Sequence, residues 1–137
     1  MLADDKLGHL REQYCNPLPQ SYIEAFNEIS KDSNNELIVA VKGDDILGTL
    51  QITFIPYLTF KGGLRAQIEA VRVHKNHRGK GLGKKFLQWA IDRAKEKNCH
   101  LVQLTTNKER DRAKDFYDSL GFKSTHEGMK LYLNPWL

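Results

Sequence analysis

The sequence predicts an α/β fold in which helices cover the faces of a mixed sheet. Strand-like runs fill the middle of the chain, and two amphipathic helical patterns then flank a further strand-like run. Two more strand-like runs close the chain. This order of elements, without a repeat or a low-complexity linker, is typical of a mixed sheet with helices on its faces.

The first half of the chain holds two helical patterns and three strand patterns. Apolar residues run without a break over residues 37–41, which is typical of a strand covered on both faces. Apolar and polar residues alternate over residues 46–54, which predicts a strand buried on one face. The predicted elements are helices over 7–15 and 21–29, strands over 37–41, 46–54 and 66–73, a tight turn at 43–45, and a short strand or loop at 57–60.

The second half repeats helix and strand patterns around a glycine-rich loop. An apolar stripe at three- and four-residue spacings predicts a helix that packs on a sheet and runs to about residue 97. A buried strand and a second helix follow, and Gly121 stands where a left-handed helix cap belongs. The predicted elements after the first helix are a strand over 101–105, a helix over 108–120, and closing strands over 122–125 and 129–133.

The composition is that of an ordinary globular domain. At 137 residues the chain is long enough for one core and short for two, so we expect a single domain over residues 1–137. Hydrophobic residues make up 40% and charged residues 28%, and no apolar run is long enough to cross a membrane. The N-terminal residues are partly acidic and lack an apolar signal segment. We therefore expect a cytoplasmic protein without a membrane partner.

Cysteine, histidine and charge patterns narrow the chemistry. Cys15 and Cys99 lie far apart in the sequence, and the 5 histidines show no metal-ligand spacing, so we expect no bound metal. The formal net charge of +4 suits either nucleic acid or an anionic cofactor, so charge alone does not decide. The sequence lacks a basic helix with interleaved aromatic residues, and we expect no nucleic-acid partner.

A glycine-rich loop is the most informative motif. Residues 78–83 read Arg-Gly-Lys-Gly-Leu-Gly between a strand pattern and a helix pattern. Closely spaced glycines let the main chain approach an anion, and a helix N-terminus leaves its first N–H groups unpaired. The loop therefore predicts a diphosphate cradle. It is not a P-loop, which needs Ser or Thr after its lysine, nor a dinucleotide fingerprint, whose third glycine would fall at Lys84.

The pattern Arg-x-x-Gly-x-Gly resembles that of the GNAT superfamily of N-acetyltransferases, in which it binds the pyrophosphate of acetyl-CoA. The resemblance extends from about residue 37 to residue 133 and includes Ala-Lys-Asp-Phe-Tyr-Asp-Ser-Leu-Gly-Phe at residues 113–122. It implies a mostly antiparallel central sheet of six or seven strands and about four helices. It also implies a splayed parallel pair, at residues 66–73 and 101–105, whose gap admits the acyl chain.

The resemblance further implies how acetyl-CoA is held. Backbone amides of Val71 to Val73 would pair with the pantetheine arm, and the amide of Val71 or its neighbour would face the thioester oxygen. The loop at 78–83 would hold the diphosphate. Asn107 would bond the pantetheine or cap the following helix, and the sequence leaves both uses open. The implied cofactor-binding residues are Val71, Arg72, Val73, Arg78, Gly79, Lys80, Gly81, Leu82, Gly83, Lys84 and Asn107.

Glu69 and Tyr117 are the candidate catalytic residues. Glu69 lies among apolar residues in a predicted strand, where burial disfavours a charged carboxylate, and it resembles the family carboxylate that takes a proton from the incoming ammonium. A surface glutamate, or one paired with Arg72 or Arg65, is the alternative. The resemblance implies that Tyr117 protonates the departing thiolate, and a core aromatic is the alternative.

The sequence thus predicts an acetyl-CoA-dependent N-acetyltransferase that acts on a primary amine, which we expect to belong to a small molecule. Neither motif contains a cysteine, which favours direct attack of the amine on the thioester. A protein lysine or N-terminal acetyltransferase and a non-catalytic acyl-CoA sensor are the alternatives. The apolar tail Pro135, Trp136 and Leu137 could dock on a second copy and make a homodimer.

Overall fold

The computed structural model of the chain describes residues 1–134, so the tail from which the homodimer is predicted lies outside the described residues. Packing divides the chain into two compact units, Met1–Gln103 and Leu104–Leu137. The first unit holds the glycine loop and nearly all of the sheet, and the second holds the last helix. That the whole chain forms one domain stays a prediction. Within the described part, no helix has the length and apolar character needed to span a bilayer.

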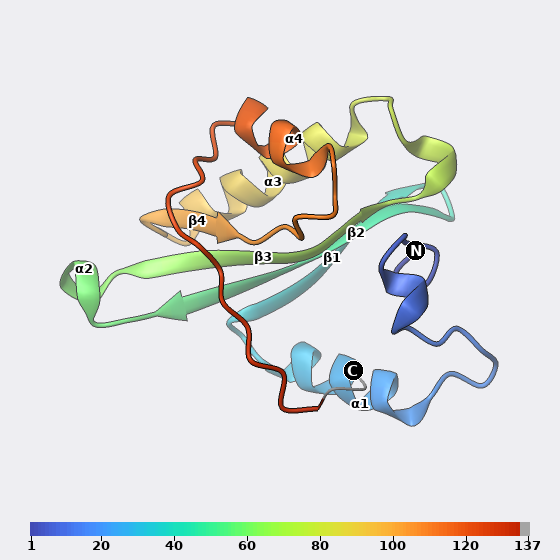
Figure 1. Cartoon of the computed structure of the whole chain (residues 1–137). Coiled ribbons are helices and arrows are strands. Elements are labelled where there is room, and N and C mark those ends of the chain that lie inside the picture. Colours follow the sequence, from blue (N-terminus) through green and yellow to red (C-terminus); the bar gives the residue numbers. More distant parts are fainter. Residues whose placement is uncertain (135–137) are drawn as a thin grey trace. The chain divides into compact units, whose positions relative to one another are not determined.

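A four-stranded sheet forms the framework of the first unit (Figure 1). The first three strands are antiparallel, and the fourth runs parallel to the third. The predicted mixed sheet and its parallel pair are therefore confirmed, whereas the prediction of six or seven strands is wrong for residues 1–134. The strands lie side by side in chain order as β1 Asn35–Lys42, β2 Asp45–Pro56, β3 Leu64–Val73 and β4 Leu101–Leu104.

Helix α3, Leu82–Glu96, covers one face of this sheet (Figure 1). It has the apolar stripe that its sequence predicts, and it packs against β2 and β3. Alternate residues of the two strands meet the helix, because successive side chains on a strand point to opposite faces. The buried hydrophobic core consists of Leu50, Ile52, Phe54, Ala66, Ile68, Phe86, Leu87, Ala90 and Ala94.

Strand β1 is less covered than its apolar run predicts. Leu37, Val39 and Val41 are 43%, 48% and 60% exposed, so the prediction of a strand covered on both faces is wrong. The reason is position, since β1 lies at the edge of the sheet while α3 packs on β2 and β3. Helix α1, Gln20–Lys31, forms as predicted and lies next to β1 (Figure 1).

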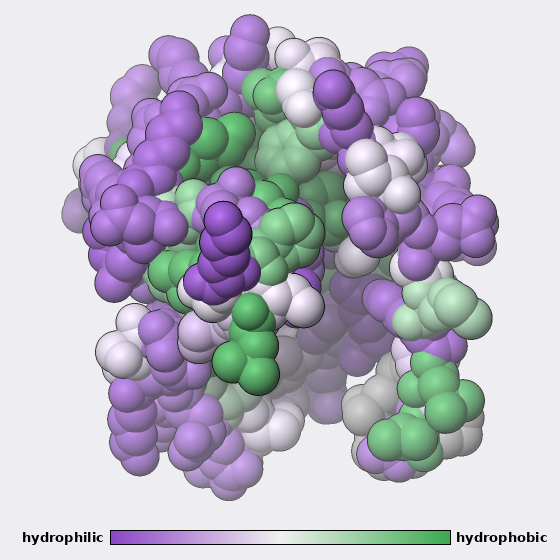
Figure 2. Space-filling view, turned by 90° about the vertical axis from the view of Figure 1, so that its left-hand side faces the viewer, coloured by the Kyte–Doolittle hydropathy of each residue, from purple (hydrophilic) through white to green (hydrophobic). Residues whose placement is uncertain are grey.

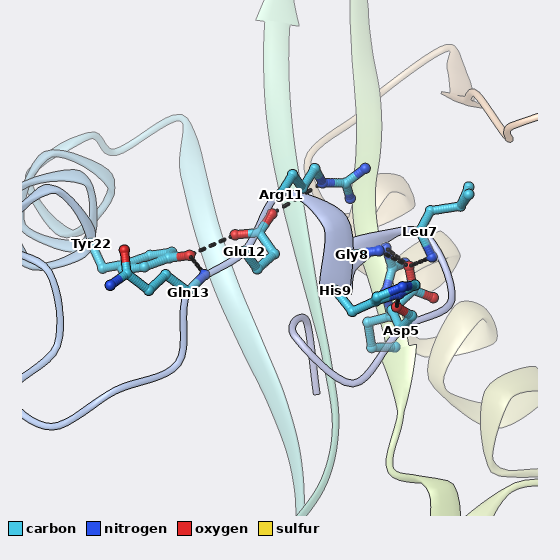
Figure 3. A network of polar contacts seen from close by, with 9 residues as sticks. Asp5, Leu7, Gly8, His9, Arg11, Glu12, Gln13 and Tyr22 are labelled. Carbon is cyan, nitrogen blue, oxygen red and sulfur yellow. Dashed lines mark hydrogen bonds and ion pairs between the residues drawn. The ribbon is translucent and has the colours of Figure 1, made fainter. Parts of the chain in front are cut away.

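The N-terminal segment does not form the helix predicted over residues 7–15. A short 3-10 turn, η1 Gly8–Leu10, stands in its place. The Asp5 carboxylate accepts hydrogen bonds from the amides of Leu7 and Gly8 at 3.3 and 3.0 Å (Figure 3). These two amides would be unpaired at the start of a helix, so this contact caps the turn. The Gln13 amide, which a helix would pair with the His9 carbonyl, donates instead to the Tyr22 hydroxyl at 2.9 Å (Figure 3).

The connection between β2 and β3 contains a single turn, α2 Thr59–Gly62, where the sequence allows a short strand or a loop. Phe60 and Lys61 have φ angles of 53° and 59°, in the left-handed region. Leu58 and Phe60 are 95% and 72% exposed. Figure 2 looks onto this end of the sheet and shows hydrophobic side chains exposed among hydrophilic ones.

The second unit contains helix α4, Ala113–Ser119, which begins five residues later than the predicted 108. The Asn107 side chain accepts a hydrogen bond from the amide of Glu109 at 2.9 Å, and this turn occupies the predicted first part of the helix. Gly121 ends the helix with a φ of 94°, which confirms the predicted left-handed cap.

The predicted closing strands at 122–125 and 129–133 are wrong for the described residues, since no strand follows β4 up to residue 134. Met129, Leu131 and Leu133 are 94%, 87% and 88% exposed. Alternation specifies which side chains would share a face, but a strand also needs a neighbour that takes its hydrogen bonds.

Candidate active site

A β-bulge interrupts β3 just before the glycine loop. Glu69 lies opposite Gln51 and Arg72 lies opposite Thr49, so three steps along β3 face two steps along β2. Ala70 takes a φ of 53° at this point. A bulge carries one residue more than its partner strand can pair, which leaves main-chain groups out of the ladder. The amides predicted to meet the pantetheine arm and the thioester therefore follow an interruption of the β2–β3 ladder.

The link from β3 to the loop is held in place by main-chain and side-chain bonds. The His74 amide donates to the Leu47 carbonyl at 2.7 Å, which extends the strand contact. A 3-10 turn, η2 Lys75–His77, follows. Arg78 then folds back, and its Nε donates to the Val73 carbonyl at 3.1 Å. Arg78 thus ties the glycine loop to the end of β3, a role that its place in the motif does not reveal.

The glycine loop has the backbone that an anion cradle needs. Gly79 and Gly81 take φ angles of 74° and 78°, which side chains disfavour, and an added Cβ at either would meet nothing within 4 Å. Open space on this side of the main chain leaves room for a ligand. The loop therefore combines a conformation that glycine allows with unobstructed access.

The start of α3 supplies free amides and positive charge. Gly81 is the N-cap, with no side-chain cap, and the first turn contains no acidic residue. The Lys85 amide donates to the Gly81 carbonyl at 3.3 Å, so the amides of Leu82, Gly83 and Lys84 precede the first helical hydrogen bond. Lys84 and Lys85 are exposed. The site fits the diphosphate of a coenzyme, because amides, helix dipole and ammonium groups all favour anions.

Glu69 is exposed, so the burial expected from its apolar neighbours is wrong. The reason is strand alternation: Ala66 and Ile68 face α3 and are buried, while Glu69 lies on the other face. Gln67 lies on the same face as Glu69, and its Oε1 accepts a hydrogen bond from Gln103 Nε2 at 2.6 Å. Glu69 therefore stands on a polar face that spans the parallel pair.

The two arginines named as possible partners of Glu69 have other contacts. Arg72 pairs with Asp5 at 3.4 Å, and the side chains are only 13% and 7% exposed. Arg72 also donates to the Val71 carbonyl at 2.7 Å. The guanidinium of Arg65 lies over the Tyr57 ring at 4.8 Å from its centroid. The Arg72 side chain therefore links the N-terminal segment to the bulged part of β3.

Asn107 and Tyr117 belong to the second unit, which is described by itself. The side-chain oxygen of Asn107 is engaged in a turn with Glu109, whereas α4 begins after Arg112, so Asn107 does not cap that helix. Tyr117 lies in an aromatic group, with ring centroids 5.3 Å from Phe116 and 5.9 Å from Phe122. Its predicted role as proton donor stays a prediction.

A small hollow lies beside η2. It measures about 200 Å³ and is lined by Asp45, Ile46, His74, Asn76 and His77. The two imidazole rings are 5.9 Å apart. Across residues 1–134, no three His, Cys, Asp or Glu side chains gather in a way that would hold a metal ion.

The sequence matches the profile of the acetyltransferase (GNAT) family over residues 5–122, which includes the bulge, the loop and α3. The chain belongs to the GNAT family. Members of this family typically use acyl-CoA, in agreement with the anion cradle at α3. A solved structure described as a transcriptional regulator from Bacillus halodurans C-125 shares 59% identity and a TM-score of 0.94 with this GNAT chain. The match covers 96% of this chain and 88% of that one.

Curated relatives cover the chain less completely. N-alpha-acetyltransferase 30 from Saccharomyces cerevisiae is 32% identical over 52% of this chain and 40% of its own length. Glucosamine 6-phosphate N-acetyltransferase from Trypanosoma brucei brucei is 31% identical over 64% of this chain and 58% of its own. Aminoalkylphosphonate N-acetyltransferase from Salmonella typhimurium is 25% identical over 78% and 69%. This GNAT chain thus spans between two fifths and about two thirds of these relatives.

Two features of the candidate site are not predicted from the sequence. The bulge leaves no signal, because alanine is not a residue that favours positive φ. The stacking of Arg65 on Tyr57 joins residues from both ends of the β2–β3 connection. The available signal is the alternation of Arg65, Gln67 and Glu69, which places three polar side chains on one face.

Proposed function

We propose that the chain is an acetyl-CoA-dependent N-acetyltransferase that acetylates a primary amine of a small molecule by direct attack. One observation carries the proposal: a bulged strand is followed, after the short turn η2, by a loop with two left-handed glycines and a helix N-terminus without a side-chain cap. The cradle at Gly79 to Lys84 would hold the diphosphate. The amides of Val71 to Val73 would hold the pantetheine arm, and the amide next to the bulge would face the thioester oxygen. When bound, acetyl-CoA supplies an activated acetyl group.

Amide geometry matters more than the helix dipole in this cradle. The dipole contributes about 0.3–1 kcal/mol at an exposed site. Each hydrogen bond to a charged acceptor contributes roughly 1.5–3 kcal/mol. The conformation of the loop glycines therefore decides affinity, because it aims those amides.

Glu69 would accept the proton of the incoming ammonium, directly or through water, and Tyr117 keeps its predicted role as donor to the departing thiolate. A general base typically contributes about 10²–10⁴-fold. Holding the reactants together can supply effective molarities of roughly 10⁵–10⁸ M. Loss of Glu69 should therefore slow the reaction without abolishing it, and its exposed position is compatible with a base that works through water.

The relatives support a small amine as acceptor. Two of them are named for glucosamine 6-phosphate and for aminoalkylphosphonates, which are small molecules that carry both an amine and an anionic group. The yeast relative is named an N-alpha-acetyltransferase, which supports a protein N-terminus as the alternative. The small-molecule proposal is preferred, because the aminoalkylphosphonate match covers more of this chain than the yeast match.

Release of free CoA thiol with a panel of amines tests the proposal. The assay uses a Cys15→Ser background, since Cys15 is exposed and would react with a thiol reagent. We expect turnover with at least one small amine, a slower rate in Glu69→Gln, and a slower rate in Tyr117→Phe. Unchanged rates in both variants would remove these two roles. Tight acetyl-CoA binding without transfer to any amine, peptide or polyamine would instead indicate an acyl-CoA sensor.

A regulator that binds nucleic acid is a second candidate, because the Bacillus halodurans relative is described as a transcriptional regulator. The exposed lysines at positions 75, 80, 84 and 85 would then contact phosphates of a nucleic acid. Measuring CoA binding in the presence of excess DNA distinguishes the acetyltransferase from the nucleic-acid-binding regulator. If the cradle serves acetyl-CoA, DNA binding is weak and CoA binding survives excess DNA, whereas a regulator shows salt-dependent DNA binding without acetyl transfer.

A further inference from the structure

The parallel pair of strands begins at an aromatic cluster, at the opposite end of β3 from the glycine loop. The His100 amide donates to the Leu64 carbonyl at 2.8 Å, which joins the starts of β4 and β3. The Tyr57 hydroxyl forms a hydrogen bond with His100 Nε2. Phe60 closes the cluster, with its ring centroid 4.9 Å from that of His100 and 6.0 Å from that of Tyr57. Figure 2 faces this end of the first unit.

Arg65 packs on this cluster, and no acidic side chain of residues 1–134 pairs with it. Its guanidinium lies 4.8 Å from the Tyr57 ring centroid, and its Nε is buried without a hydrogen-bond acceptor. Among residues 1–134, Arg65 makes no ion pair. Stacking on an aromatic ring holds a guanidinium flat and leaves its edge for a carboxylate or phosphate. A half-buried cation with an unmet donor is costly unless an anion meets it.

Arg65 lies on the same strand face as the candidate base. The register from Arg65 to Glu69 is regular, and the intervening Ala66 and Ile68 are 0% and 2% exposed toward α3. Arg65, Gln67 and Glu69 therefore share the face away from α3. Four residues of strand separate the Cα atoms of Arg65 and Glu69 by about 13 Å at roughly 3.3 Å per residue. Both side chains are long, so their charged groups can approach each other more closely than the Cα atoms do.

We infer that Arg65 binds an anionic group of the acceptor, so that the substrate is a small primary amine that carries a carboxylate, phosphate or phosphonate. This inference rests on the proposed acetyl transfer. The ammonium end is favoured near the Glu69 carboxylate, and the anionic end is favoured at Arg65. Between them lie the hydrogen-bonded side-chain amides of Gln67 and Gln103, which provide a polar surface for the substrate. An amine without an anion gains only the first of these interactions.

Steady-state kinetics with matched amines tests the inference. Acetyl-CoA is kept saturating, and aminomethylphosphonate, β-alanine and γ-aminobutyrate are compared with propylamine. We expect wild type to prefer the anionic amines. Arg65→Gln should raise their KM by about 10-fold or more, the factor expected for one charge-assisted hydrogen bond. The KM values for propylamine and acetyl-CoA should not change.

Two further variants separate recognition from folding and from net charge. Arg65→Lys should restore only part of the affinity for the anion, because an ammonium cannot reproduce the flat, two-pronged contact. Arg112→Gln removes the same charge at an exposed position and should leave every KM unchanged. Equal use of propylamine and anionic amines by wild type, or an equal KM rise for propylamine in Arg65→Gln, would overturn the inference.

Failure of the proposed function gives a different result. If wild type transfers acetyl to no amine, calorimetric titration with aminomethylphosphonate replaces the kinetics. Binding to wild type that Arg65→Gln loses supports an anion site at Arg65. No binding to wild type removes the site together with the enzyme.

Discussion

Two glycines with the same backbone angle allow a matched test of the anion cradle. Gly79 lies in the cradle and Gly62 lies in the distant β2–β3 connection, and both take a φ of 74°. An added Cβ would meet nothing within 4 Å at either position. Gly79→Ala and Gly62→Ala therefore impose the same conformational penalty without a steric collision.

The penalty of a left-handed alanine is roughly 1–2 kcal/mol, so both variants should lose a similar free energy of unfolding. Relief of that strain rotates the main chain, and at Gly79 this turns the cradle amides away from the diphosphate. Each lost hydrogen bond to a charged acceptor removes about 1.5–3 kcal/mol of binding. We therefore expect Gly79→Ala to weaken CoA binding by about 10- to 150-fold, at 1.4 kcal/mol per factor of ten.

Calorimetric titration with CoA and urea unfolding of the same preparations provide the comparison. Gly62→Ala should bind CoA as wild type does while showing the same loss of stability. Two results would refute the reasoning: unchanged CoA affinity in Gly79→Ala, or an equal affinity loss in Gly62→Ala. The second would mean that the affinity follows general stability rather than the geometry of the loop.

Three further predictions concern stability and reactivity. Leu87 is 0% exposed beneath the sheet, so Leu87→Ala should lower the free energy of unfolding by about 2–5 kcal/mol, measured by urea denaturation. Hydrogen bonds from Arg93 lower the pKa of Glu36, and this effect outweighs burial, which raises it. The pair therefore stabilises the fold above pH 4.5, and this contribution is lost as the pH falls through the lowered pKa. Glu36→Gln should therefore reduce the urea midpoint at neutral pH and have little effect well below pH 4.5. Burial raises the pKa of the Cys99 thiol and outweighs the opposite effect of Lys97. Because the thiolate is the reactive form, iodoacetamide should label the exposed Cys15 before Cys99.

Local periodicity predicts the part of the fold that holds the cradle. The alternation over residues 46–54 and the stripe of α3 specify which side chains meet, and Leu50, Ile52, Leu87 and Ala90 are all 0% exposed. The glycine loop is also predictable, because glycine is the residue type that adopts positive φ angles without steric cost. These features depend on neighbours close in sequence, so a single chain is enough to infer them.

Features set by side-chain bonds to the main chain are not predictable in this way. The Tyr22 hydroxyl takes the Gln13 amide that a helix over 7–15 would pair with His9, and Asn107 forms a separate turn with Glu109 before α4. The apolar pattern of the sequence does not show which side chain will bind a given main-chain group. The closing strands fail for another reason, since alternation at Met129 and Leu131 does not say which strand would pair with them.

The bulge in β3 leaves main-chain groups out of the ladder and also changes the face on which later side chains lie, because it inserts one residue into the strand. In regular alternation from Glu69, Arg72 would point toward α3 and the core. The register instead sets Arg72 opposite Thr49, which shares a face with Gln51 and hence with Glu69. Arg72 thereby reaches Asp5 and pairs with it where both side chains are largely buried. A shift of one residue turns every later side chain to the other face, so the insertion in β3 also brings Arg72 to Asp5 of the N-terminal segment.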